Sequence, residues 1–190
     1  MPNAGCHPYL PMNHENTTQH NKTDDMNMPL TFVKKSIPWL LLLAFFWGGQ
    51  AYINRDLVSH TPPPIQGKTL QGQTFQLEQL KGKPALIYFW ASWCSICRLM
   101  ENTVSDISQN TAIVSIAMQS GSDEAVNQYL KKKNLLTPVI NDPEGHVAAR
   151  YGIKGVPTVF ILDPKGDIKF ATSGYSPGWA VRLRLWLAGL

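Results

Sequence analysis

The sequence predicts an α/β fold in which helices flank a mixed central sheet. Two near-continuous apolar runs, residues 84–90 and 112–118, have the length and composition of strands that are buried on both faces. Segments with helical periodicity follow these runs. Two further strands, at 158–162 and 167–172, close the chain as a hairpin around Asp163-Pro164-Lys165-Gly166, a strong turn sequence. Helices and strands in this order pack as layers around one sheet.

A small hairpin is expected before the first buried strand, with strands at 68–70 and 74–77 around Gln71-Gly72-Gln73. The helix that follows the first buried strand begins near Cys94 and ends near Ser108. One of its sides is apolar and carries Ile96, Leu99, Met100, Val104 and Ile107.

After the second buried strand, Ser122 is expected to cap a helix that reaches Lys133. A short apolar piece at 139–140 and a helix at 144–151 come before the closing hairpin. The last helix begins at Ser176-Pro177, with proline at its first position. Three large aromatic residues are expected in the core: Tyr151, Phe160 and Trp179.

Four segments divide the chain. Residues 1–36 are polar and predict a disordered leader, and residues 65–190 form the globular domain. The apolar segment 37–53 follows a lysine pair and predicts a single-pass transmembrane signal anchor, although a cleaved export signal is the alternative. A linker at 54–64 ends in three prolines, which predicts a stiff spacer. This arrangement places the domain in the periplasm, on the outer side of a bacterial inner membrane, where disulfides persist.

Charge and cysteine usage exclude several classes of protein. The net charge of +4 comes from scattered lysines and arginines, so no nucleic-acid surface is indicated. Three cysteines are too few for a disulfide framework. A zinc site would need two ligands besides Cys94 and Cys97, and the domain offers only His146, so no metal is expected. A peroxidase would carry threonine three residues before Cys94, where the chain has Ala91.

The pair Cys94 and Cys97 predicts disulfide exchange. A cysteine in the first turn of a helix is favoured as thiolate, which is the nucleophile of this reaction, so Cys94 is expected to attack from an exposed position. Cys97 lies one turn further on the same face and is expected to be more buried. It would resolve the mixed disulfide, while Ser95 and Ile96 would tune the redox poise.

A second candidate element is Gly155-Val156-Pro157-Thr158, which comes sixty residues after the cysteine pair. A proline directly before a strand is often cis in a tight turn. If Pro157 faces the cysteine pair, the backbone of Val156 becomes an edge to which a substrate strand can pair.

Three segments, Phe89–Cys97, Gly152–Thr158 and Asp163–Gly166, together resemble the thioredoxin superfamily. Within it they are most similar to the membrane-anchored TlpA-like branch, and to its suppressor of copper sensitivity D type of protein disulfide oxidoreductase. The resemblance implies a thioredoxin-like fold with an N-terminal hairpin and an inserted helix and strand around 122–141. It also implies that Cys94 attacks, Cys97 resolves, Pro157 is cis and Trp93 flanks the substrate.

Two positions depart from the family pattern. Thioredoxin has a buried aspartate six residues before its first active-site cysteine, where this chain has Tyr88, and many relatives have proline at Ile96. Glu101 lies four residues after Cys97 and is expected to be a solvated residue on the helix surface.

These observations predict an exported enzyme that exchanges its disulfide with cysteine-containing exported proteins. The resemblance favours the reductive direction, with re-reduction by a membrane electron carrier and no cofactor. A disulfide-donating periplasmic oxidant and a copper-binding thiol module are the alternatives. In the second, copper would also bind to leader residues: His7, Met12, His14, His20, Met26 and Met28.

Overall fold

The structure is a computed structural model that describes residues 30–190 except 134 and 136, with side chains described from residue 37 onward. The chain divides into two units, and the second, Ala44–Leu190, contains the sheet and the candidate site. The predicted leader, its candidate copper ligands and Cys6 lie outside the described residues.

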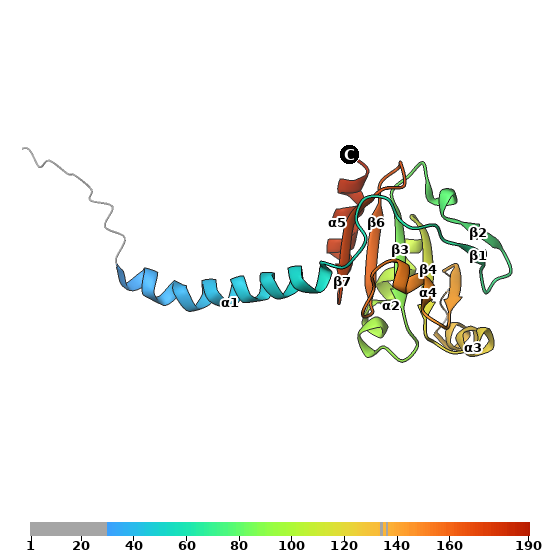
Figure 1. The fold of residues 1–190 in the computed structure, drawn as a ribbon, viewed down its shortest axis with the longest axis horizontal. Helices are drawn as coiled ribbons and strands as arrows, with labels where there is room; N and C mark the ends of the chain where they lie inside the picture. Colours follow the sequence, from blue (N-terminus) through green and yellow to red (C-terminus); the bar gives the residue numbers. More distant parts are fainter. Residues whose placement is uncertain (1–29, 134, 136) are drawn as a thin grey trace, which may run out of the picture. The chain divides into compact units, whose positions relative to one another are not determined.

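A five-stranded sheet forms the centre of the second unit, in the order β5-β4-β3-β6-β7 (Figure 1). Its strands are β3 (Ala85–Trp90), β4 (Ala112–Met118), β5 (Val139–Asp142), β6 (Thr158–Leu162) and β7 (Ile168–Ser173). The three strands β5, β4 and β3 run parallel, whereas β6 is antiparallel to both β3 and β7. The predicted mixed sheet is confirmed.

Helices cover both faces of this sheet. The α-helices that follow β3 are α2 (Ser95–Ser108), α3 (Asp123–Lys133), α4 (His146–Arg150) and α5 (Gly178–Ala188). Alternate residues of β3 divide the core, because successive side chains of a strand point to opposite faces. Leu86 and Trp90 pack in one cluster with α2, α3 and α5, and Ile87 and Phe89 in a second cluster with α4 and the segment before β3.

Several predicted boundaries agree closely with the structure. The bounds of β4 and β6 match the predicted ranges, and Ser122 accepts a hydrogen bond from the backbone N–H of Ala125 at 3.3 Å, as a helix cap should. The final helix begins one residue late, since Pro177 is its N-cap and not its first residue.

The predicted inward faces of α2 and α5 need correction. Cys97, Met100, Val104 and Ile107 are the buried residues of α2, whereas Ile96 and Leu99 are 46% and 68% exposed. These two residues precede Cys97 and Met100, and a rotation of about 100° per residue carries them off the buried face. Trp179, which was expected in the core, is 71% exposed, whereas the expected burial of Tyr151 and Phe160 is confirmed.

The N-terminal hairpin is present, but its first strand is shifted. Its strands are β1 (Gln66–Lys68) and β2 (Thr74–Gln76), and a short 3₁₀ helix, η1 (Leu77–Leu80), follows. Thr69 closes the turn, because its carbonyl and hydroxyl oxygens accept from the N–H groups of Gly72 and Gln73. Leu70 then leaves the hairpin and donates its N–H to the Val139 carbonyl of β5 at 2.8 Å.

A helix, α1 (Leu30–Asn54), precedes the domain and contains the segment predicted as a transmembrane anchor. Within the described part of the chain, no helix combines the length and apolar character that crossing a bilayer requires. The predicted spanning anchor at 37–53 is therefore not supported. Its continuous apolar run covers only Ile37–Trp47 and is followed by Gly48-Gly49-Gln50, whereas about 20 apolar residues suit a bilayer.

The segment predicted as a spacer, 54–64, contacts the domain along its length. The N–H of Val58 donates to the Tyr151 carbonyl, and the Tyr151 hydroxyl donates to the Pro63 carbonyl at 2.7 Å. Further contacts run to β7: the N–H of Ile168 donates to the His60 carbonyl, and the N–H of Ser173 donates to the side-chain oxygen of Asn54 at 3.1 Å.

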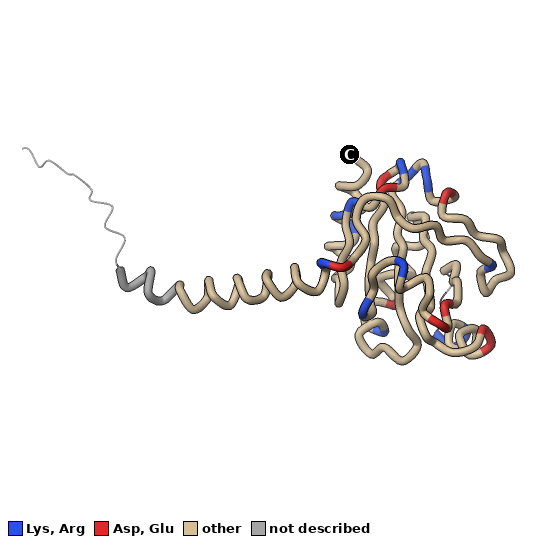
Figure 2. The backbone as a smooth tube through the Cα atoms, in the orientation of Figure 1, with Lys and Arg blue, Asp and Glu red and all other residues tan. Residues whose placement is uncertain are grey.

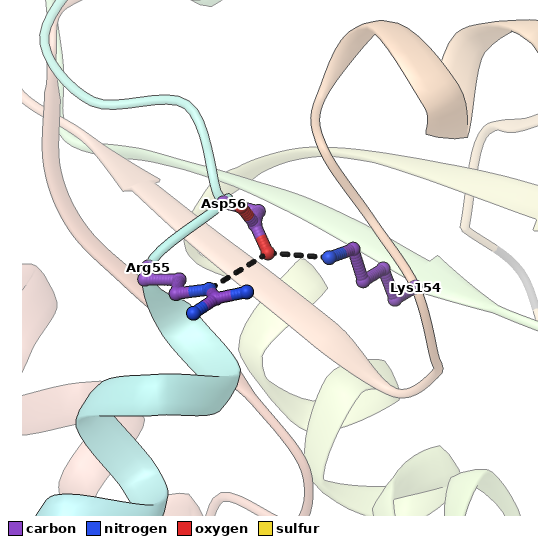
Figure 3. A network of polar contacts seen from close by, with 3 residues as sticks. All are labelled: Arg55, Asp56 and Lys154. Carbon is purple, nitrogen blue, oxygen red and sulfur yellow. Dashed lines mark hydrogen bonds and ion pairs between the residues drawn. The ribbon is translucent and has the colours of Figure 1, made fainter.

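A surface ion pair holds the start of this segment against the loop after α4. The carboxylate of Asp56 pairs with Lys154, and Arg55 lies on its other side with its Nε 3.5 Å away (Figure 3). The hydrogen bond from Lys154 lowers the pKa of the Asp56 carboxyl. The Asp56 side chain is exposed to solvent, so the ion pair contributes little to the free energy of unfolding. Its main effect is to fix where the segment lies on the domain.

Candidate active site

The two cysteines lie where β3 ends and α2 begins, and they form a disulfide with their Cα atoms 5.3 Å apart. Cys94 is the N-cap of α2, and its Sγ accepts a hydrogen bond from the N–H of Cys97 at 3.1 Å. An N–H donor and the positive end of the helix dipole both favour negative charge on this sulfur. The geometry suits a Cys94 thiolate once the disulfide is reduced.

Both cysteines are more enclosed than their neighbours. Cys94 is 6% exposed and Cys97 only 1%, so Cys94 has less solvent access than was expected, although it is the more accessible of the two. Trp93, Ser95 and Ile96 around them are exposed. Exposed apolar side chains of Trp93 and Ile96 therefore lie beside the disulfide in the chain.

The predicted proline loop lies directly against the disulfide. The peptide bond between Val156 and Pro157 is cis, as expected. The carbonyl oxygen of Val156 lies 3.5 Å from the Sγ of Cys94, with Val156 half-buried and Pro157 buried. The Thr158 hydroxyl fixes the loop by donating to the Gly155 carbonyl at 2.8 Å. Residues 62 positions apart in the chain are thus in contact at the sulfur.

A loop that was not singled out from the sequence supports Trp93. Its indole N–H donates to the Gln119 carbonyl at 2.9 Å, and the N–H of Ser92 donates to the Ser120 hydroxyl at 3.0 Å. Gln119 and Ser120 follow β4, which runs parallel to β3. Because the carboxyl ends of parallel neighbours meet at one edge of a sheet, the two predicted buried strands would have pointed to this loop if they had been taken as parallel.

A small cavity of about 20 Å³ lies behind Cys97, with room for a water molecule. Its lining combines apolar and polar residues: Tyr88, Trp90, Cys97, Glu101, Val104, Ser115, Leu130, Leu135 and Thr137. The hydroxyl of Tyr88 is buried and has no hydrogen-bond partner. Burial raises the pKa of this hydroxyl, and the negative charge of Glu101 raises it further, so Tyr88 stays neutral.

Glu101 is not the solvated residue that was expected. Its carboxylate accepts a hydrogen bond from the Tyr129 hydroxyl and lies 3.3 Å from the ammonium group of Lys133, and its side chain is only 13% exposed. Burial and this hydrogen bond raise the pKa of Tyr129. Both partners lie on α3, so the position of Glu101 depends on the packing of α3 against α2.

The redox pair is the chemically distinctive feature of the site. No group of three or more His, Cys, Asp or Glu residues in the described part of the chain is arranged to hold a metal ion. The two cysteines are three residues apart at the start of a helix, and a backbone carbonyl beside them could accept a hydrogen bond from a bound chain. This arrangement suits exchange of disulfides with another molecule.

Comparison with known proteins agrees with this chemistry. A model of the AhpC/TSA family matches residues 58–171, which is more than half of the chain. The chain belongs to the AhpC/TSA family. The matched range includes the cysteine pair and the loop of Pro157.

Relatives within this thioredoxin-like superfamily carry redox names. The chain is 35% identical to a thioredoxin-like protein of Haemophilus influenzae, over 72% of this chain and 83% of the relative. It is 28% identical to sporulation thiol-disulfide oxidoreductase A of Bacillus subtilis, over 76% and 89%. A secreted Mycobacterium tuberculosis disulfide oxidoreductase, homologous to E. coli DsbE, superposes with a TM-score of 0.57 at 26% identity, over 65% and 95%.

These findings confirm the predicted thioredoxin-like fold and the predicted class of enzyme, a thiol–disulfide oxidoreductase.

Proposed function

We propose that the protein is an exported thiol–disulfide oxidoreductase that reduces disulfides of cysteine-containing exported proteins through Cys94 and Cys97. The observation that carries the proposal is the disulfide at the start of α2, with the Val156 carbonyl 3.5 Å from the Cys94 sulfur. The greater accessibility of Cys94 supports its role as the attacking residue, and the burial of Cys97 supports its role as the resolving residue.

The proposed reaction conserves atoms and electrons. The Cys94 thiolate attacks one sulfur of a substrate disulfide, and the other substrate sulfur leaves as a thiolate. Cys97 then attacks Cys94, which releases the second substrate sulfur and closes the Cys94–Cys97 disulfide. The substrate has gained two electrons and the enzyme has lost them. A dithiol donor, proposed to be a membrane electron carrier, returns them to the enzyme.

The site offers a place for the substrate chain. Trp93 and Ile96 provide exposed apolar contacts on either side of the sulfur, and the backbone of Val156 can pair with an extended substrate segment. Ser95 and Ile96, between the cysteines, are proposed to tune the reduction potential. Ala91, in place of a peroxidase threonine, supports disulfide exchange over peroxide reduction.

Export is proposed from two lines of support. The apolar run Ile37–Trp47 after Lys34 and Lys35 has the length of the apolar core of a signal sequence. The Mycobacterium relative is described as secreted. Within the superfamily, the similarity of the motifs to the TlpA-like branch and its suppressor of copper sensitivity D type supports the reductive direction.

The reduction potential tests the direction. Equilibration of the Cys94–Cys97 pair with glutathione should give a value close to that of thioredoxin, about −270 mV. A value close to that of DsbA, about −120 mV, would instead identify a disulfide-donating oxidant.

The exchange itself is tested by trapping. In cells that express the full chain with Cys97→Ser, mixed disulfides with partner proteins should accumulate on Cys94, because the resolving thiol is absent. The matched control is the double variant Cys94→Ser, Cys97→Ser, which retains Cys6 and so reports any adducts formed there. Adducts that are equally abundant in the control, or absent from both, would contradict the proposed roles.

A further inference from the structure

The last helix, α5, presents a row of large apolar side chains to solvent. We call this row the α5 outer face, and it consists of Trp179, Leu183, Trp186 and Leu187 of the helix together with Leu190, two residues beyond its end. Trp179, Trp186 and Leu190 are 71%, 62% and 86% exposed. The spacing of three to four residues places the row on one side of the helix.

The opposite side of α5 is also apolar and is already in use. Ala180, Val181, Leu185 and Ala188 are buried, and the last three belong to the cluster shared with α2. A soluble helix usually has one apolar side, and a helix with apolar residues on two opposite sides is normally covered on both. The α5 outer face therefore requires a covering surface that this chain does not provide among its described residues.

The polar residues of α5 indicate what kind of surface fits. Its only charged residues are Arg182 and Arg184, and the helix contains no acidic residue, so Figure 2 shows blue but no red on α5. The helical spacing of the two arginines places them on the two sides of the outer face. Neither arginine belongs to an ion pair formed within the described part of the chain. Tryptophan and leucine between arginines are typical of helices that lie in the interface of a membrane with anionic lipids.

We propose that the α5 outer face rests in the interfacial layer of a membrane that contains anionic lipids. Trp179 and Trp186 would insert at headgroup depth, and Arg182 and Arg184 would contact lipid phosphates. A second copy of the chain fits less well. A helix of this length is about 17 Å long and about 10 Å wide, so its outer side offers much less than the ~800 Å² per partner of a stable interface, and two such helices would bring their arginines together.

This placement leaves the disulfide accessible. Cys94 follows the C-terminal end of β3, whereas the end of α5 lies beside Pro84 at the start of that strand. The active site and the far end of the outer face are therefore at opposite ends of β3. A domain held through α5 can still receive a substrate chain at Trp93 and Val156.

The experiment follows the two tryptophans by hydroxyl-radical footprinting of the full chain, with vesicles of phosphatidylglycerol or phosphatidylcholine and without vesicles. We expect phosphatidylglycerol vesicles to slow oxidation of Trp179 and Trp186 several-fold. Trp93, which is 60% exposed and lies at the active site, is the internal reference and should change little. Site-specific readout separates the contribution of α5 from any binding through α1.

Two variants sharpen the test. Arg182→Gln with Arg184→Gln should weaken phosphatidylglycerol binding by roughly ten-fold or more, since each basic residue near an anionic surface contributes about a five-fold factor. Trp179→Ser with Trp186→Ser should also weaken it, whereas Trp93→Ser should not. Equal protection with phosphatidylcholine, protection that rises with protein concentration in the absence of vesicles, or no protection would overturn the proposal. The second of these outcomes would identify a second copy as the occupant.

Discussion

At the scale of single residues, the hydroxyl of Tyr88 is buried without a partner, whereas the similarly buried Tyr151 donates to the Pro63 carbonyl. We expect Tyr88→Phe to leave the free energy of unfolding unchanged or to raise it by up to about 1 kcal/mol, because a desolvated hydroxyl is removed. Tyr151→Phe, the matched control, should lower it by about 1 kcal/mol. Urea unfolding measures both. A clear loss of stability in Tyr88→Phe would show instead that a water in the cavity binds this hydroxyl.

Glu101 is the one carboxylate among the residues that line the cavity behind Cys97. Under the proposed function, Cys97 must lose its proton when it resolves the mixed disulfide, and this carboxylate is placed to accept it. We expect Glu101→Gln to slow resolution about ten-fold or more, measured by rapid quenching of the mixed disulfide across pH. Lys133→Met removes the ion pair but keeps the carboxylate and should slow resolution much less. Equal rates in wild type and Glu101→Gln would exclude this role.

The sequence predicted individual site residues better than their surroundings. Cys94, Cys97 and the cis proline are confirmed in position, because short motifs specify their local backbone. The partners of Glu101 could not be predicted, since Tyr129 is 28 residues away and its contact depends on how α3 packs on α2. The chemical roles of the site residues remain predictions.

At the scale of elements, the turn between β6 and β7 depends on Asp163. Burial raises the pKa of its carboxyl, but the N–H groups of Asp167 and Lys165 and the charge of Lys169 outweigh burial, so the pKa lies below its usual value. A lowered pKa in the folded state adds stability above the unfolded pKa of about 4. This stability is lost as pH falls through the folded pKa.

We therefore expect Asp163→Asn to lower the free energy of unfolding at pH 7 by about 1–2 kcal/mol. The difference from wild type should shrink as the pH falls below about 4, because the wild-type carboxylate becomes protonated. Urea unfolding at a series of pH values measures this. Asp56→Asn is the control, because it removes an exposed carboxylate whose pKa is also lowered. It should change the free energy of unfolding little. If the difference in the free energy of unfolding between wild type and Asp163→Asn did not change with pH, the ionised Asp163 carboxylate would not be what stabilises the turn.

Elements with strong periodicity were predicted within a residue or two, as β3, β4, β6 and α2 show. Their positions depend on local patterns of burial. The first hairpin strand was misplaced because Leu70 pairs with β5, a contact between distant segments that no local pattern reports. Trp179 was misplaced because α5 is apolar on both sides, so its periodicity does not indicate which side faces the core.

At the scale of the whole molecule, Gly152, which follows α4, lies against the backbone of the segment before the domain. Its φ is +69°, and a Cβ at this position would overlap the carbonyl oxygen of Asp56. We expect Gly152→Ala to cost several kcal/mol, because backbone overlap adds to the cost of the left-handed conformation. Gly72→Ala, with a φ of +83° in open space, should cost only about 1–2 kcal/mol.

Thermal and urea unfolding of both glycine variants check this prediction. Equal losses would indicate that Asp56 moves freely and that the segment is not fixed to the domain. The sequence did not predict this attachment. Three consecutive prolines indicate a spacer whether or not the other residues of the segment contact the domain.

Segments outside the sheet cover parts of its two edges. β5 and β7 are its two outer strands, and each has backbone groups that are satisfied from outside the sheet. Leu70 and Gln71 bond to Val139 of β5, while His60 and Asn54 accept from Ile168 and Ser173 of β7. Open strand edges recruit strands of other molecules and lead to aggregation. Since one end of β5 and both ends of β7 are occupied, less of each edge is open to strands of other molecules. Under the proposed function, the backbone at Val156 is then the place where an extended segment of another protein pairs with this chain.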